Sequence, residues 1–175
     1  MKSLLPVDEA RRRILQGAGP ISDVEMVSLV EARDRLLAHD ISAMRSQPPF
    51  AASAMDGYAV RHENVANAPC RLTIIGEAPA GHGFTGTVGP GQTVRIFTGA
   101  PVPVGADAIV IQEDTDRTDD QHVLINLAVP KGHYIRPEGL DFAAGDHVLH
   151  AGQRLDAGRI TVAAAMNHPK LPVRR

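Results

Sequence analysis

Three polar residues of this chain stand beside glycines at the ends of apolar segments. Asp56 precedes a glycine within the stretch Pro48–Val60, Thr98 leaves an apolar run at a glycine, and Asp141 lies between two glycines. Two carboxylates and a hydroxyl on tight turns suit a binding or catalytic site better than they suit ordinary surface. Three unrelated turn residues would give the same pattern, so the spacing alone leaves both interpretations open.

The stretch Pro48–Val60 shows how such a turn is built. Two prolines hold its beginning extended, small residues follow, and Gly57 is free to take a positive φ. Apolar residues on either side, Phe50 and Tyr58 among them, anchor the turn and leave Asp56 accessible. Because Asp-Gly is also a common hairpin pair, a plain hairpin turn is the alternative at this point.

Composition limits the classes of protein. With 175 residues the chain can form one core or two small subdomains, and the absence of Trp makes that core largely aliphatic. The formal net charge of −2 argues against a nucleic-acid partner. No apolar run approaches the roughly 20 residues of a membrane helix, and the first residues do not resemble a signal peptide. We therefore expect a cytoplasmic protein without a membrane partner.

Helical patterns lie towards the two ends of the chain. Apolar spacing predicts a helix over Pro6–Gln16 and a second over Val30–His39, with a short strand at Val24–Leu29 between them. An alanine-rich segment, Ala157–Asn167, predicts a further helix. We expect these end segments, residues 1–45 and 137–175, to pack together as one subdomain.

The middle of the chain differs in composition, with Gly or Pro every few residues and apolar runs of strand length. These runs are Tyr58–Val60, Leu72–Ile75, Thr93–Phe97, Ala108–Ile111 and Val123–Leu127. No helical period separates them, which favours a β subdomain over βαβ units. The sequence therefore predicts a β-rich α+β fold, with residues 46–136 forming a β subdomain inserted between the ends.

Several short motifs match known sites only in part. Gly81–Gly86 reads G-x-G-x-x-G, but a Gly-Pro-Gly follows where a dinucleotide site needs a helix. Asp114–Thr118 begins like a calcium loop, yet the later glycine and glutamate are absent, so an acidic hairpin tip is the better interpretation. The histidines lack zinc spacing, and Ser53 has no nucleophile elbow around it.

Longer motifs carry a family resemblance. They are Pro48-Pro-Phe with Ser53-Ala-Met-Asp-Gly-Tyr-Ala, then Arg95-Ile-Phe-Thr-Gly-Ala-Pro, and then Arg136-x-x-Gly139-x-Asp141. In this order they closely resemble the N-terminal half of molybdopterin molybdenumtransferase, the MoeA and gephyrin E-domain family, over nearly the whole chain. The resemblance implies bifurcated, coiled sheets in the β subdomain and packed short helices at the chain's ends.

The resemblance also implies a reaction. Molybdate is inserted into the dithiolene of adenylylated molybdopterin with Mg²⁺ present, and AMP is released. Family members are homodimers, and molybdopterin adenylyltransferase is the upstream partner. The catalytic positions match Asp56, Thr98 and Asp141, and the substrate-binding positions match Ser53, Gly57, Gly99 and Arg136. Asp56 and Asp141 are expected to hold Mg²⁺ or orient water, and Thr98 to donate to a phosphate or molybdate oxygen.

Two departures from the family pattern bear on activity. The chain stops at Arg175, about where the family's molybdopterin-binding third domain should begin, and the C-terminal β domain is also missing. Ala51 and Ala52 stand where the family commonly has Asp-Asn. We therefore expect no insertase activity from this chain alone. The alternative is a non-catalytic dimerisation or partner-docking module with the same fold.

Overall fold

The computed structural model describes residues 5–19 and 21–175, which divide into two compact units. One unit contains the chain's ends, up to Ser42 and from His147 onward, and the other is Ala43–Asp146. The middle unit therefore has wider bounds than the 46–136 predicted from the sequence. It takes in residues 137–146, so that Asp141 belongs to the same unit as Asp56 and Thr98.

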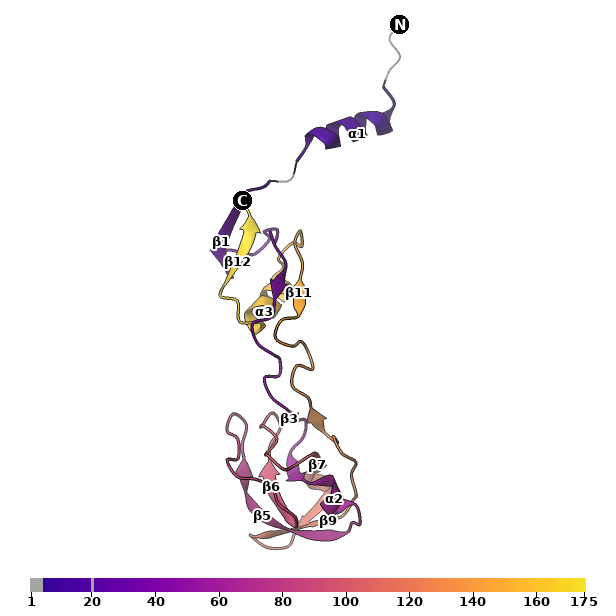
Figure 1. Ribbon diagram of the computed structural model, residues 1–175, viewed down its shortest axis with the longest axis vertical. Helices are drawn as coiled ribbons and strands as arrows, with labels where there is room; N and C mark the ends of the chain where they lie inside the picture. The colour runs from indigo at the N-terminus through magenta and orange to yellow at the C-terminus, as the bar shows by residue number, and fades with distance from the viewer. Residues whose placement is uncertain (1–4, 20) are drawn as a thin grey trace. The chain divides into compact units, whose positions relative to one another are not determined.

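A curled six-stranded sheet forms the middle unit (Figure 1), with strand order β7-β4-β6-β5-β9-β8. Its strands are β4 (Gly57–Val60), β5 (Cys70–Ala78), β6 (Gln92–Ile96), β7 (Ala108–Ile111), β8 (Thr115–Arg117) and β9 (His122–Ile125). β5 and β6 are parallel, and the other neighbours in the sheet are antiparallel. A single helical turn, α2 (His62–Val65), follows β4, and a 3-10 turn, η1 (Gln112–Asp114), follows β7. All five strands expected from the apolar runs are present.

Successive residues of the central strands belong to two different hydrophobic clusters. On β4, Tyr58 and Val60 lie in one cluster and Ala59 in the other. On β7, Val110 belongs to the first cluster and Ile109 to the second. Because alternate strand residues point to opposite faces, both faces of the sheet are covered, and the strands read as continuous apolar runs.

The incoming and outgoing segments of the middle unit run side by side. β3 (Ala52–Ser53) pairs antiparallel with β10 (Ile135–Arg136), and the Gln47 amide donates to the Phe142 carbonyl at 2.8 Å. The Asp141 amide in turn donates to the Gln47 carbonyl at 2.9 Å. Backbone hydrogen bonds therefore fix Asp141 beside a segment nearly a hundred residues earlier in the chain.

Gly57 is required for close packing. It lies inside β4 and not at a hairpin turn, so the plain-hairpin alternative is wrong. Its φ is not among the positive values found in this chain, so the expectation of a left-handed turn there is also wrong. A Cβ at this position would lie 2.0 Å from the Val110 carbonyl oxygen. Only glycine lets β7 approach β4 this closely.

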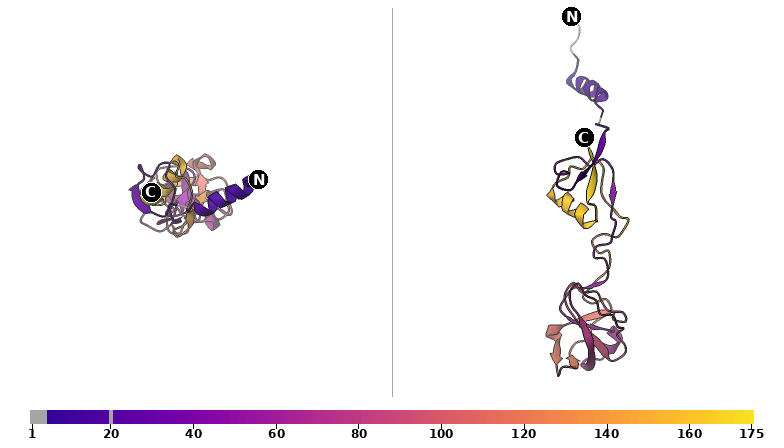
Figure 2. Two further views of the ribbon diagram at one scale, coloured as in Figure 1. Left: turned by 90° about the horizontal axis from the view of Figure 1, so that it is seen from above. Right: turned by 90° about the vertical axis from the view of Figure 1, so that its left-hand side faces the viewer.

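The unit formed by the chain's ends contains two small sheets and a helix. β1 (Val24–Ser28) pairs with β12 (Lys170–Arg174), and β2 (Ile41–Ser42) pairs with β11 (His147–Leu149), both antiparallel (Figure 2). Helix α3 (Ala157–Ala165) begins at Asp156, whose carboxylate accepts a hydrogen bond from the Arg159 amide at 2.9 Å. The expectations of a strand near Val24 and a C-terminal helix are confirmed.

The helix predicted over Val30–His39 does not form. The segment contains only a turn that ends near Asp34, which has a φ of 66°. Leu36 and Leu37 are extended and bridge to Arg154 and Val173. The Leu37 side chain is buried, so tertiary pairing to two other strands overrides a weak helical period.

The first helix is confirmed as α1 (Val7–Gly17), but none of its residues is buried. Val7, Ile14 and Leu15 leave most of their side-chain surface exposed, at 82%, 72% and 60%. The expected packing of the end helices on one another therefore does not involve burial of α1. Within the part of the chain that the structure describes, no helix is long and apolar enough to span a bilayer.

The contact at Gly57 makes a stability prediction. Gly57→Ala should lower the free energy of unfolding by at least about 2 kcal/mol, because its methyl group overlaps a backbone oxygen that cannot move without opening the sheet. Urea denaturation of both proteins measures the difference.

Gly83→Ala is the matched control, since its Cβ would meet only the Pro101 side chain at an ordinary 3.6 Å. Equal unfolding free energies for the two variants would show that the β4–β7 contact tolerates a side chain.

Candidate functional site

The carboxylate of Asp56 is fixed by Thr98. One of its oxygens, Oδ1, accepts hydrogen bonds from the Thr98 amide at 2.7 Å and from the Thr98 hydroxyl at 2.6 Å. The other oxygen has no hydrogen-bond partner among the described residues. Asp56 lies directly before β4 and Thr98 two residues after the end of β6, and these strands are neighbours in the sheet. Strand pairing thus brings the two residues together, and one carboxylate oxygen is left available for a ligand.

Thr98 lies in a tight turn whose geometry depends on glycine. The Ala100 amide donates to the Phe97 carbonyl at 2.9 Å, and Gly99 between them has a φ of 83°. That is the position at which a type II turn needs a positive φ. The Gly99 amide also donates to the Ser53 carbonyl at 2.9 Å, so the Thr98 turn is tied to the segment that precedes Asp56.

Ser53 has a role within the protein itself. It is completely buried, and its hydroxyl donates to the Met55 carbonyl at 2.6 Å. This bond shapes the loop that leads into Asp56. Direct contact between Ser53 and a substrate stays a prediction, and the hydroxyl proton already engaged with Met55 does not favour it.

The environment of Asp56 stabilises its ionised form. The Thr98 hydroxyl, and then the Thr98 amide, hold the pKa of Asp56 below its ordinary value, and the positive charge of Arg95 adds to this effect. Partial desolvation opposes the shift without cancelling it. Asp56 is therefore a carboxylate at neutral pH, which suits it to binding a cation.

Arg136 and Asp141 line a hollow of about 360 Å³ in the same unit. Gly99, next to Thr98 in the chain, lines it too, so the Thr98 turn forms part of the hollow's wall. The other lining residues are Gln47, Pro48, Pro49, Phe50, Ala52 and Leu140. Both charged side chains are exposed, and neither makes a side-chain hydrogen bond or ion pair with another described residue. Their charges are thus available to a ligand.

Of the two alanines that depart from the family's Asp-Asn pattern, one lines this hollow. Ala52 is 5% exposed and lines the hollow, whereas Ala51 points to solvent. In β3, Ala52 pairs with Arg136. A methyl group is therefore present at a buried position of the wall where the family pattern led us to expect a polar side chain.

Sequence reasoning missed two residues that shape the site, Arg95 and Gln112. The Gln112 amide donates to the Asp56 carbonyl at 3.1 Å, and an Arg95 nitrogen donates to the Gly57 carbonyl at 3.0 Å. Arg95 opens the motif Arg95-Ile-Phe-Thr-Gly-Ala-Pro, and a charged residue between Val94 and Ile96 was the available signal. Gln112 gave no signal, because its role depends on where β7 ends in space.

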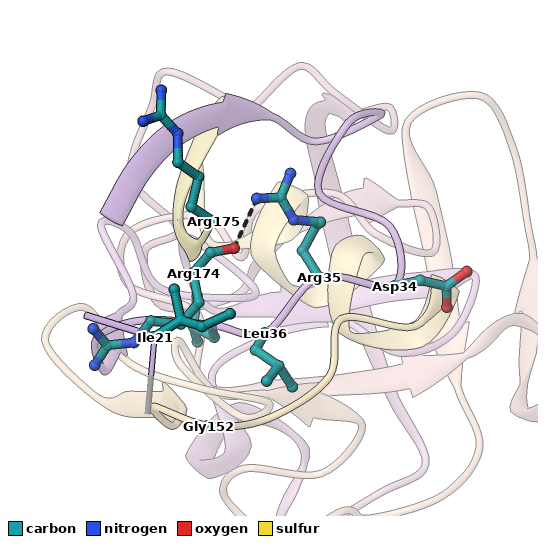
Figure 3. A pocket seen from close by; sticks show the side chains of 8 residues that line it. Ile21, Asp34, Arg35, Leu36, Gly152, Arg174 and Arg175 are labelled. Atoms are coloured by element: carbon teal, nitrogen blue, oxygen red, sulfur yellow. Dashed lines mark hydrogen bonds between the residues drawn. The ribbon is translucent and has the colours of Figure 1, made fainter. Parts of the chain in front are cut away.

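Other polar groups lie apart from these residues. The largest pKa shift falls at the tip between β8 and β9, where the Gln121 amide and then His122 lower the pKa of Asp119 to about 2. Asp119 is ion-paired with Arg71 and His122 there. The acidic hairpin tip therefore lies at residues 118–121, whereas most of the segment predicted to form it, Asp114–Thr118, belongs to η1 and β8. The unit of the chain's ends has a separate hollow of about 440 Å³. In it, the Arg35 guanidinium donates to the Arg174 carbonyl at 2.7 Å (Figure 3).

Known proteins share this fold and these motifs. The family described as the MoeA N-terminal region, domains I and II, matches residues 5–167. The chain therefore belongs to the MoeA family and corresponds to its N-terminal region, which confirms the resemblance carried by the motifs.

Curated relatives place the match within longer proteins. Over 158 residues the chain is 40% identical to the molybdopterin molybdenumtransferase of a Nostoc species, covering 87% of this chain and 36% of that protein. It is 39% identical over 177 residues to molybdopterin molybdenumtransferase 2 of Mycobacterium tuberculosis, covering 99% of this chain and 42% of that protein. The chain thus spans about two fifths of the length of these relatives.

A solved structure supports the fold directly. The molybdopterin biosynthesis moeA protein of Pyrococcus horikoshii superposes with a TM-score of 0.91 at 35% identity, covering 98% of this chain and 46% of that one. The β-rich α+β fold expected from the sequence is confirmed by this match as well as by the strands themselves.

The bonds to Asp56 make a pH prediction. Thr98→Val removes the hydroxyl donor and keeps the side-chain shape, so the pKa of Asp56 should rise towards its ordinary value. Because the folded-state pKa is lowered, the stability from these bonds is present above the ordinary pKa and is lost as the pH falls through the lowered value. Carbon NMR of the Asp56 carboxyl during an acid titration measures the change.

Thr118→Val serves as the control, because its hydroxyl donates to the His122 carbonyl at the distant hairpin tip. An Asp56 titration that is the same in the wild-type chain and in Thr98→Val would contradict the assignment.

Proposed function

We propose that this chain is the N-terminal part of a molybdenum insertase. In this reaction molybdate enters the dithiolene of adenylylated molybdopterin and AMP is released. The observation that carries the proposal is the Asp56 carboxylate, held by Thr98 with one oxygen available. The residue after Thr98, Gly99, lines the hollow that presents Arg136 and Asp141. The names of the curated relatives support the same reaction class.

Arg136 and Asp56 have different tasks in this proposal. A carboxylate alone would repel an anionic substrate, so a positive charge must lie near it. Arg136 supplies one at the hollow, and its planar guanidinium can bind phosphate or molybdate oxygens in pairs. At its available oxygen Asp56 then binds either the metal ion or the water molecule that attacks the phosphoanhydride, whose proton passes to solvent.

Thr98 orients Asp56 in this scheme. Its single hydroxyl proton is already donated to Asp56, so donation to a phosphate or molybdate oxygen would require that bond to break. We therefore assign Thr98 a positioning role in place of the donor role expected from the sequence. Gly57 and Gly99 set the backbone on which the two side chains are placed.

The carboxylates fit a magnesium ion that is bound mainly through substrate phosphates. Mg²⁺ commonly uses one or two protein carboxylates, with waters and phosphate oxygens completing its shell. The described residues contain no group of three or more metal-ligating side chains, and Asp56 and Asp141 each have carboxylate oxygen available. Asp56 and Asp141 would hold the ion, which would neutralise charge on the phosphates.

The complete site needs more than this chain. We propose that the full-length protein is a cytoplasmic homodimer in which the site joins this region to the molybdopterin-binding domain of the other subunit. Molybdopterin adenylyltransferase is the proposed source of the substrate. The proposal rests on the family membership and on the share of the relatives' length that the chain covers.

A second candidate function is a dimerisation or partner-docking module without chemistry. One observation favours it: α1 has an exposed apolar side formed by Val7, Ile14 and Leu15, and the helix has no buried residue. Apolar surface of this kind is typical of an interaction site. The charged hollow and the Asp56–Thr98 pair are unexplained by a docking role, so we favour the insertase.

Complementation tests the proposed function. This chain should release no AMP from adenylylated molybdopterin and molybdate by itself. It should do so when mixed with the separately produced C-terminal part of the Nostoc relative, starting where the aligned region ends. In the mixture, Asp56→Asn should reduce AMP release by about a hundredfold or more, because the carboxylate is lost and the shape is kept.

Asp114→Asn is the matched control, since Asp114 is a carboxylate of the same unit on η1 and makes no side-chain hydrogen bond. AMP release by the chain alone would contradict the expected inactivity. Undiminished release by the Asp56→Asn mixture would remove Asp56 from the chemistry and favour the docking module.

A further inference from the structure

The guanidinium of Arg95 is half-buried and has neutral partners. Its Nη1 donates to the Gly57 carbonyl at 3.0 Å, and its Nη2 donates to the Gln112 side-chain oxygen at 2.6 Å. Its central carbon lies 5.2 Å from the centre of the Tyr58 ring and 4.9 Å from that of Phe97. No carboxylate of the described residues forms an ion pair with Arg95. These neutral contacts, and no direct ion pair, hold the half-buried guanidinium in place.

These contacts converge on the peptide that carries Asp56. The Asp56 carbonyl accepts from the Gln112 amide at 3.1 Å, while the Gly57 carbonyl accepts from Arg95. Arg95 and Gln112 are joined in turn by their side chains. The successive carbonyls of Asp56 and Gly57 are therefore held by two residues that bind each other.

Arg95 also contacts the turn that carries Thr98, the hydrogen-bond partner of Asp56. It lies in β6, three residues before Thr98, and stacks against Phe97, the first residue of the Thr98 turn. In the sheet, Arg95 pairs directly with Tyr58 of β4. One side chain thus contacts the segment that ends in Thr98, the strand that begins after Asp56, and η1.

We propose that Arg95 is a positioning residue whose forked guanidinium sets the orientation of the Asp56 carboxylate towards the Thr98 amide and hydroxyl. The planar fork is essential, because it bonds two acceptors at fixed angles while both aromatic rings contact the guanidinium. A lysine ammonium has the charge but neither the fork nor the flat face. The inference rests on the proposed function only for the importance of the pair, since the positioning itself is measurable without substrate.

Amide NMR of this chain tests the proposal. A hydrogen bond to a carboxylate moves an amide proton downfield and slows its exchange with solvent. In Arg95→Met the Thr98 amide should move upfield and exchange about tenfold faster. Arg95→Lys should show the same change in reduced size, because lysine can bond one of the two acceptors. Asp56→Asn calibrates the shift that follows when the carboxylate acceptor is lost.

Two controls separate positioning from general stability. Arg71→Met removes an arginine from β5 of the same sheet, where it pairs with Asp119, and should leave the Thr98 amide unchanged. The Ile109 amide, which donates to the His133 carbonyl, reports on the core and should keep its exchange rate in every variant. If Arg95→Met does not fold, the Thr98 amide is measured in Gln112→Ala, which removes one of the two acceptors of the Arg95 guanidinium.

Clear outcomes overturn the proposal. A Thr98 amide that is unchanged in folded Arg95→Met, or in Gln112→Ala when that variant must decide, shows that Arg95 does not orient the pair. Equal acceleration at Thr98 and Ile109 shows a purely structural role. Neither result depends on turnover, so they are distinct from a failure of AMP release in the complementation experiment.

Discussion

The close approach of β7 to β4 at Gly57 is the constraint on which the site depends. A Cβ at Gly57 would overlap the Val110 carbonyl, so the two strands can lie this close only with glycine there. This contact fixes where β7 ends, and hence where Gln112 meets the Asp56 carbonyl. The neighbouring strand β6 then delivers Thr98 to the Asp56 carboxylate. The packing of the sheet's central strands therefore also determines where the polar groups of the site lie.

Polar groups in this chain serve two distinct purposes. At the hairpin tip, Asp119 has neighbouring donors for its charge, and its strongly lowered pKa reflects a satisfied ion-pair network. At the hollow, Arg136 and Asp141 have no such partners among the described residues, and Asp56 uses one oxygen only. The size of a pKa shift is therefore a poor guide to function here, and available charge beside a hollow is the better one.

The family assignment and the local geometry support different parts of the argument. Membership in the MoeA family follows from the match over residues 5–167 and from relatives that extend well beyond this chain. The geometry supports a narrower proposal, that this region contributes an oriented carboxylate at Asp56 and a hollow with charged side chains to a larger site. It also shows the Thr98 hydroxyl donating its one proton to Asp56, and this is why we propose a positioning role for Thr98.

The sequence alone determined the class of fold, five strands of the middle unit and the candidate residues Asp56, Thr98 and Asp141, because short apolar runs and polar residues beside glycines are local patterns. It failed where distant segments compete. The segment with Leu37 is extended, since pairing with other strands outweighs its helical period. Tertiary structure decided three further features. They are the need for glycine at position 57, the hydrogen bond from the Ser53 hydroxyl, and the hydrogen bonds from Arg95 and Gln112 to the carbonyls of Gly57 and Asp56. Each is a contact between residues far apart in the chain, or depends on burial, and no local spacing encodes it.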